Sequence, residues 1–255
     1  MLSAWEAVLL GLLQGLTEFL PVSSSGHLII AQHLLGINEP MLTFDIAVHV
    51  GTLAAVISAF WQDVKSLLKN PLSKTMLLLI IGTVPAVLAA LLFGDVIESM
   101  FSSLGVVAVA LVLTGILLLF SDNFQGQGRL EDMSYGKALM VGLFQAAAIV
   151  PGLSRSGSTI FASLLGGLSR ADAARFSFLL SIPVILGAAA KQLLDAGSGG
   201  IVWHWTYLLG AAVAALAGYA AIRVFLKLLQ QRNLRYFACY CWALAALATI
   251  LRILA

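Results

Sequence analysis

Long apolar stretches separated by short polar breaks run along most of the chain. Runs such as Met76 to Phe93 and Leu104 to Phe120 are long enough to cross a bilayer as helices. The pattern predicts six membrane-spanning helices, at about Leu42 to Trp61, Thr75 to Gly94, Phe101 to Phe120, Asp172 to Leu193, Trp203 to Ile222 and Tyr236 to Leu254. We therefore expect an all-α integral membrane protein.

Two further segments do not fit a simple span. In each, an apolar stretch of roughly 12 residues ends near a proline, Pro21 or Pro151, and a second short apolar stretch follows a group of serines and glycines. Neither arm is long enough to cross a bilayer, so we expect two re-entrant helical hairpins. Irregular backbone at membrane depth is tolerated where protein or a water-filled cavity satisfies its polar groups, which predicts that both breaks line a polar pocket.

These two segments are copies of each other. Residues Gly11 to Gly36 return 131 positions later as Gly142 to Gly167, without a gap and with ten identities. The chain then divides into repeats at about residues 1–121 and 132–255, each with one hairpin and three spans. Transporters built from such repeats place their site where the broken helices meet. We expect a single membrane domain, residues 1–255, with its site at that meeting point.

The placement of Lys and Arg predicts the orientation. Basic residues gather between the first and second spans and between the fifth and sixth: Lys65, Lys69, Lys74, Arg223, Lys227, Arg232 and Arg235. The connection around Asp95 and Glu98 has none. Basic loops lie in the cytoplasm, so both termini should lie outside, with the first hairpin opening to the exterior and the second to the cytoplasm. The two repeats would then have inverted topology.

Composition agrees with a membrane protein and limits its partners. Hydrophobic residues make up 60% of the chain and charged residues 10%, and the formal net charge of +2 reflects membrane topology. No basic surface interleaved with aromatic residues is present, so we expect no nucleic-acid partner. Cys239 and Cys241 are two apart in a predicted helix, where they point in different directions and cannot bridge.

The first copy contains a dense polar cluster. Gln14 and Glu18 are four residues apart and share one helix face, which points toward the break. An ionisable residue in a membrane segment usually faces a pathway or a partner. The serines that follow, Ser23, Ser24 and Ser25, stand at a helix N-terminus, where they either cap the helix or help to attract an anion. His27 is a packing histidine or, if it lies near Glu18 and Ser24, a proton-transfer group.

The second copy, Pro151-Gly-Leu-Ser-Arg-Ser-Gly-Ser-Thr159, supplies the opposite charge. Arg155 carries a planar guanidinium suited to phosphate oxygens, and hydroxyls flank it. Arg155 could instead be a structural partner of Glu18, and the two roles are compatible because a resting salt bridge can open for a substrate anion. His49 and Asp45 are weaker candidates, since a local pair four residues apart explains them.

Together the motifs resemble those of the undecaprenyl-diphosphate phosphatase family associated with bacitracin resistance. The likeness rests on Gln14-x-x-x-Glu18, on Phe19-Leu-Pro-Val-Ser-Ser-Ser-Gly-His27 and on Pro151 to Thr159, and it covers essentially the whole chain. It implies six spans and two re-entrant hairpins in the bacterial cytoplasmic (inner) membrane, with the active site facing the periplasm. It also implies hydrolysis of a phosphoric anhydride, in which the C55 polyprenyl diphosphate gives the monophosphate carrier for peptidoglycan synthesis.

The resemblance further implies roles for single residues. The expected catalytic residues are Glu18, Ser24, His27 and Arg155. The expected substrate- and phosphate-binding residues are Gln14, Ser23, Ser25, Ser154, Ser156 and Thr159. The family depends on a divalent cation, Mg²⁺ or Ca²⁺, and at the position of Gln14 it has Glu or Gln. Because Gln carries no charge, we expect Glu18 to be the metal ligand.

Two questions stay open from the sequence. Ser24 could act as the nucleophile, or a water held by Glu18 and the cation could attack directly. A different class of function is also open, because transporters share inverted repeats with broken helices, and the protein could move or flip a phosphorylated polyprenyl lipid. The clustering of Glu18, Ser24 and His27 against Arg155 favours the enzyme. Helices rich in Gly and Ala are compatible with a homodimer and equally with contacts inside one chain.

Overall fold

The computed structural model describes residues 2–37, 41–124, 126–195, 204–229 and 234–254. Throughout these residues the secondary structure is helical apart from turns and an isolated bridge between Gly128 and Leu168. The elements in chain order are α1 (Ala4–Glu18), α2 (Ser24–Leu34), α3 (Leu42–Ala59), α4 (Trp61–Lys69), α5 (Lys74–Met100), α6 (Leu104–Ser121), η1 (Leu130–Asp132), α7 (Tyr135–Ala147), α8 (Arg155–Leu165), α9 (Arg170–Asp195), α10 (Trp205–Leu229) and α11 (Leu234–Leu254). The prediction of an all-α protein is confirmed.

Five helices in the described part of the chain are long and apolar enough to cross a membrane: α5, α6, α9, α10 and α11. The first predicted span, Leu42 to Trp61, corresponds to α3, which passes the same test only together with α4. These two helices meet at Phe60 and are bent by 83°. The described chain therefore has five candidate spans, or six if the bent pair counts as one.

The predicted ends of the spans were mostly close, with two clear errors. The fifth span was expected to stop at Ile222, but α10 continues to Leu229. The second span was expected to stop at Gly94, but α5 continues to Met100. The side chains of Asp95 and Glu98 are exposed, so the helix can include them without burying their charge. Trp203, the expected start of the fifth span, lies outside the described residues, and α10 begins at Trp205.

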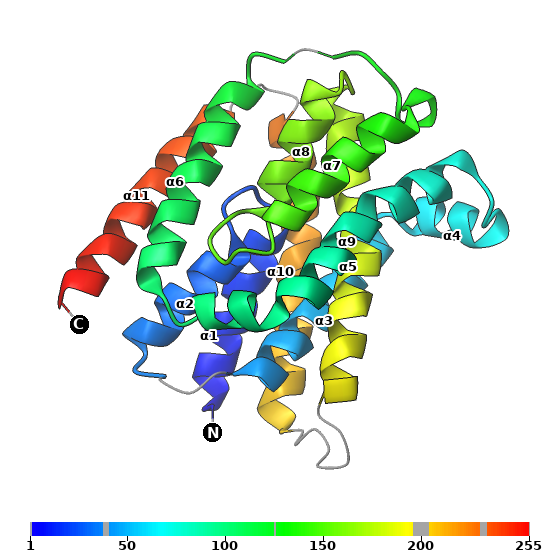
Figure 1. The fold of residues 1–255 in the computed structure, drawn as a ribbon. Helices are drawn as coiled ribbons and strands as arrows, with labels where there is room; N and C mark the ends of the chain where they lie inside the picture. The colour runs from blue at the N-terminus through cyan, green and yellow to red at the C-terminus, as the bar shows by residue number, and fades with distance from the viewer. Residues whose placement is uncertain (1, 38–40, 125, 196–203, 230–233, 255) are drawn as a thin grey trace.

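Helices of the two halves of the sequence pack against each other. Helix α1 lies against α10 and α3, α7 lies against α5, and α6 pairs with α11, which Figure 1 shows side by side. Glycines allow the close approaches, because a Cβ on Gly11 would lie 2.4 Å from the carbonyl oxygen of Gly210, and one on Gly142 would lie 2.7 Å from that of Gly82. The marked N and C ends of the chain lie toward the same end of the molecule (Figure 1).

Each copy of the repeated segment forms two short helices separated by a break. Helices α1 and α2 have 15 and 11 residues, and α7 and α8 have 13 and 11. At about 1.5 Å per residue, each is shorter than the roughly 30 Å hydrocarbon core of a bilayer. We call residues 19–23 the first break and residues 148–154 the second break. Both cysteines are free, as expected, and the buried Cys241 lies 3.7 Å from the carbonyl oxygen of Pro21 in the first break.

Candidate active site

The two breaks meet inside the protein and hold each other through reciprocal hydrogen bonds. The backbone N–H of Gly152 donates to Ser25 Oγ at 3.2 Å, and Ser156 Oγ donates to the carbonyl oxygen of Leu20 at 2.9 Å. Each break thus satisfies part of the backbone of the other, as irregular segments inside a membrane require. This contact places the start of α8 next to the end of α1.

A buried carboxylate lies at the centre of the site. Glu18, 8% exposed, accepts a hydrogen bond from the Arg155 guanidinium on Oε1 at 2.5 Å. Its other oxygen, Oε2, accepts from Ser24 Oγ at 2.6 Å and from Gln14 Nε2 at 3.0 Å. Four of the residues singled out in the sequence therefore form one cluster. An ion pair at this depth needs such extra hydrogen bonds to offset its loss of hydration.

Arg155 is held from a second side by α9. As the first residue of α8 it stands at a helix N-terminus, and its Nη1 donates to the carbonyl oxygen of Ser177 at 3.2 Å. The Ser177 hydroxyl is 2.6 Å from Thr159 Oγ1, which also donates to the carbonyl oxygen of Arg155 at 2.8 Å. Thr159 therefore supports Arg155. Because Ser177 lies in an apolar run without a motif, nothing in the sequence pointed to it.

The remaining serines of the breaks have structural partners. Ser23 and Ser154 cap α2 and α8 by accepting from the N–H groups of Gly26 and Gly157, at 3.2 and 3.1 Å. Ser25 and Ser156 make the bonds between the breaks described above. Their expected role in phosphate binding stays a prediction, whereas Ser24 is the serine whose hydroxyl points to Glu18.

The sequence left open a contact of His27 with Glu18 or Ser24, but the described hydrogen bonds of His27 go to other partners. Its Nδ1 lies 2.7 Å from the carbonyl oxygen of Ser23, and its Nε2 lies 2.7 Å from the hydroxyl of Tyr240. A carbonyl only accepts, so Nδ1 carries the proton and the Nε2 of the neutral ring accepts from Tyr240. The two rings are stacked, with centroids 5.5 Å apart. A catalytic role for His27 stays a prediction, and Tyr240 is a neighbour that its place in an apolar run did not reveal.

His49 is closer to the cluster than the sequence suggested. Its Nε2 lies 3.8 Å from Glu18 Oε2, and its Nδ1 lies 2.6 Å from the backbone carbonyl oxygen of Asp45. The Asp45 carboxylate instead accepts from Gln32 Nε2 at 3.2 Å. The predicted local hydrogen bond between His49 and Asp45 is therefore present, but it uses the backbone of Asp45 and leaves Nε2 of His49 facing Glu18 at the end of α1.

The residues of the cluster supply only some of the ligands that a divalent cation needs. Within the described residues, no group of three or more His, Cys, Asp or Glu side chains is placed to bind a metal ion. The cluster offers the Glu18 carboxylate and the side-chain oxygen of Gln14, which is buried and has no hydrogen-bond partner. Mg²⁺ is commonly held by one or two carboxylates together with phosphate oxygens of a substrate. The residues present therefore fit a cation whose coordination a phosphate-bearing substrate completes.

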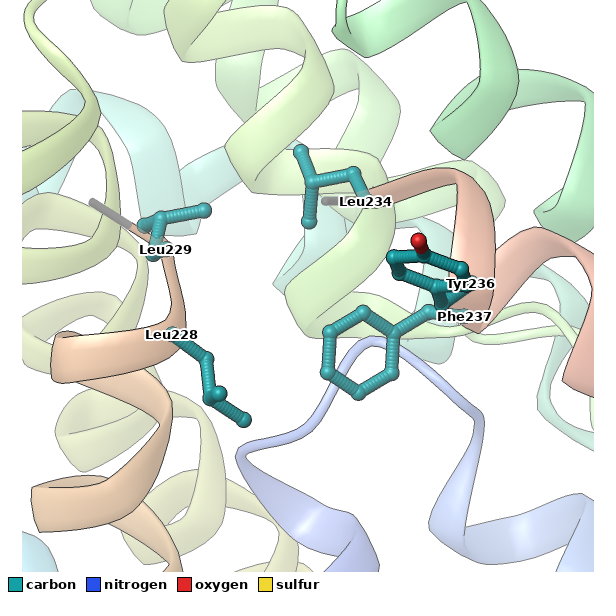
Figure 2. A pocket seen from close by; sticks show the side chains of 5 residues that line it. All are labelled: Leu228, Leu229, Leu234, Tyr236 and Phe237. Atoms are coloured by element: carbon teal, nitrogen blue, oxygen red, sulfur yellow. The ribbon is translucent and has the colours of Figure 1, made fainter. Parts of the chain in front are cut away.

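An apolar cavity is lined by none of the residues of this cluster. It has a volume of about 330 Å³ and is lined by Leu228 and Leu229 of α10 and by Leu234, Tyr236 and Phe237 of α11 (Figure 2). Its walls suit hydrocarbon and offer no cation for a phosphate group. The cavity therefore lacks the charged groups that the cluster around Glu18 supplies.

Comparison with known proteins agrees with these observations. Residues 7–247 match the family model described as bacitracin resistance protein BacA. An undecaprenyl-diphosphatase of Halothermothrix orenii is 44% identical over 253 residues, covering 97% of each chain. Undecaprenyl-diphosphatase 3 of Bacillus cereus is 42% identical over 250 residues, covering 97% of this chain and 96% of the relative. An undecaprenyl-diphosphatase of Syntrophotalea carbinolica is 42% identical over 257 residues, covering 96% and 98%.

Proposed function

The chain belongs to the bacitracin resistance protein BacA family, and we propose that it hydrolyses undecaprenyl diphosphate to the monophosphate and inorganic phosphate. Relatives between 40% and 44% identical along almost their whole length carry the name undecaprenyl-diphosphatase. The observation that supports the same chemistry in this chain is the cluster in which Glu18 contacts both Ser24 and Arg155. The reaction returns the lipid carrier to peptidoglycan synthesis, and the family name connects it with bacitracin resistance.

We propose that this multi-pass protein of the bacterial inner membrane has six spans and two re-entrant hairpins in inverted repeats. In this arrangement α3 forms the first span, α4 carries Lys65 and Lys69 of the basic loop that follows it, and the pairs α1–α2 and α7–α8 are the hairpins. The matched approaches of Gly11 to Gly210 and of Gly142 to Gly82 support two equivalent halves within a single domain. The distribution of Lys and Arg supports outward-facing termini and an active site that opens to the periplasm.

The proposed reaction begins with Ser24 as the nucleophile. Its Oγ attacks the terminal phosphorus of the diphosphate while Glu18 Oε2, which already accepts its hydrogen bond, takes the proton. The bond from that phosphorus to the bridging oxygen breaks, and the prenyl monophosphate leaves. A water then attacks the phosphorus of the phosphoserine, the bond to Ser24 Oγ breaks, and inorganic phosphate departs with the protons of the water, while the proton held by Glu18 returns to Ser24 Oγ. The rival route is direct attack by a water that Glu18 activates.

Arg155 binds the charge that the reaction moves. At rest its guanidinium pairs with Glu18, and a bound diphosphate would share it. Its place at the N-terminus of α8 adds the free N–H groups and the positive end of the helix dipole. Stabilising the additional charge on the phosphoryl oxygens lowers the barrier to transfer.

A divalent cation, Mg²⁺ or Ca²⁺, would be held by Glu18 and by the unpartnered side-chain oxygen of Gln14. When bound, it supplies positive charge to the diphosphate oxygens. The C55 chain would lie along the lipid-facing surface of the helices, where it takes the place of the hydrocarbon tails of lipids. A protein that only carries the lipid needs a binding site but no hydroxyl bonded to a buried carboxylate, so the Ser24–Glu18 contact favours the enzyme.

Phosphate release from C55 polyprenyl diphosphate tests the proposal directly. The purified protein in detergent with Mg²⁺ or Ca²⁺ should release phosphate, and Glu18→Ala and Arg155→Ala variants that remain folded should not. If the wild type binds the lipid without releasing phosphate, the carrier function replaces the phosphatase.

A further inference from the structure

His49 faces the carboxylate of the site with an atom that needs a positive partner. A backbone carbonyl can only accept a hydrogen bond, so the contact with Asp45 assigns the ring proton of His49 to Nδ1. In the neutral ring, Nε2 then presents a lone pair, and it lies 3.8 Å from Glu18 Oε2. Two acceptors that face each other at this distance repel, and the guanidinium of Arg155 lies on the other oxygen of Glu18, so a cation or an added proton would stabilise the side that faces His49.

A second atom of the same cluster has the same need. Gln14 is fully buried, and its Nε2 donates to the oxygen of Glu18 that His49 approaches. Its side-chain oxygen has no hydrogen-bond partner. A buried acceptor without a partner is costly, because it has lost the hydrogen bonds that it made with water. Adding a proton to His49 would resolve its contact with Glu18 but would leave the oxygen of Gln14 without a partner.

We propose that His49 Nε2 is a ligand of the divalent cation, together with Glu18 and the side-chain oxygen of Gln14. A cation that reaches all three would satisfy the lone pair, the carboxylate and the unpaired amide oxygen. This inference rests on the proposed function, because oxygens of the substrate diphosphate complete the set of ligands.

The nitrogen ligand has a consequence for metal preference. Carboxylate, carbonyl and water ligands suit Mg²⁺ and Ca²⁺, whereas an imidazole raises the affinity for transition metals. We therefore expect the site to prefer Mn²⁺ over Ca²⁺. Changing His49 to Gln, which offers an oxygen ligand, should lower the ratio of the two affinities about tenfold.

The direct test is whether a histidine nitrogen is bound to the metal. The full chain, labelled with ¹⁵N-histidine and purified in detergent, would be loaded with Mn²⁺ and methylenediphosphonate, a diphosphate that cannot be hydrolysed. Pulsed electron paramagnetic resonance should detect ¹⁵N coupling to Mn²⁺ in the wild type. The coupling should disappear in His49→Gln and persist in His33→Gln, a matched change at the exposed histidine in the last turn of α2.

Absence of ¹⁵N coupling in the wild type would overturn the proposal, as would its persistence in His49→Gln. If His49→Gln does not remain monodisperse, a triple variant in which His27, His33 and His204 are Gln retains His49 as the sole histidine of the four. Loss of the coupling in that folded triple variant would also overturn the proposal.

Phosphate release by the wild type with Mg²⁺ separates this inference from the function on which it rests. Release without ¹⁵N coupling removes only the role of His49. Absence of release in protein that binds the lipid removes the phosphatase itself, whatever the metal ligands are.

Discussion

The first and second breaks share one hydrogen-bond scaffold and differ in their charges. Ser23 and Ser154 occupy equivalent positions, and each caps the helix that follows by accepting from a glycine N–H, of Gly26 or of Gly157. The equivalent serines two positions later each reach across to the opposite break. Residues that are identical in the two copies therefore mainly build the loops and lock them together.

The chemistry comes from positions where the copies differ. Glu18 has Ile149 as its counterpart in the second copy, and Ser24 has Arg155. Ser24 and Arg155 thus occupy equivalent positions, and the fold brings both to the carboxylate of Glu18. The glutamines are an exception in sequence, because both copies have one, but their partners differ: Gln14 donates to Glu18, whereas Gln145 donates to the carbonyl oxygen of Gly82. In this duplicated site, a difference between copies indicates function more strongly than an identity.

Removing the charge of Glu18 should have the largest effect. Glu18→Gln leaves Arg155 without its counter-ion and Ser24 without a base, so we expect phosphate release to fall about 10³-fold. The matched change in the other copy, Ile149→Gln, adds the same amide where no charge is needed and should retain at least about half of the activity. Rates of phosphate release for the two folded variants provide the measurement. Similar losses in both would refute the claim that function lies in the asymmetry.

Ser24→Ala should reduce phosphate release about 10²-fold or more if its hydroxyl is the nucleophile. Ser25→Ala serves as the control, because Ser25 accepts a bond from Gly152 and does not contact Glu18, and it should cost only a few-fold. Single-turnover measurements, together with detection of a phosphorylated serine, follow the covalent step. Substantial turnover by Ser24→Ala would eliminate the covalent route and favour direct attack by water.

The sequence predicted much of the site because its informative residues are local. The four-residue spacing of Gln14 and Glu18 places them on one helix face, and the repeat aligns Ser24 with Arg155 across the two breaks. The cost of an isolated charge inside a membrane then favours pairing Arg155 with Glu18, which the structure contains. Charge, spacing and duplication were sufficient for this core.

Other contacts could not be predicted because they depend on how distant helices pack. Tyr240 lies 213 positions from His27, within an apolar run, and Ser177 is one of two serines in another run. The bend at Phe60 has no proline or glycine to mark it, so α3 and α4 were expected as one straight span and a loop. Periodicity indicates that a helix is apolar but not which of its few polar side chains faces the site.

Gly152 is the position at which the second break should be least tolerant of a side chain. Its φ is +93°, and a Cβ would lie 2.7 Å from the carbonyl oxygen of Val107. Gly152→Ala should therefore destabilise the protein by about 2 kcal/mol or more and weaken the contact between the breaks. Gly136→Ala is the control, because no atom lies within 4 Å of its added Cβ and alanine favours the helix. Thermal unfolding in detergent should show a lower midpoint for Gly152→Ala and an unchanged or higher one for Gly136→Ala; equal midpoints would contradict the close approach.

The two capping serines provide the finest comparison between the breaks. Both Ser23→Ala and Ser154→Ala remove a cap and should cost about 1 kcal/mol. Glycine should separate them, because Ser23 has a φ of +67° and Ser154 a φ of −66°. At Ser23, glycine removes the cap but relieves the left-handed backbone, so Ser23→Gly should be more stable than Ser23→Ala. The stability gap between the glycine and alanine variants should be about 1 kcal/mol larger at Ser23 than at Ser154. Thermal midpoints of the four variants measure both differences. Equal differences at the two positions would show that the first break carries no backbone strain of its own.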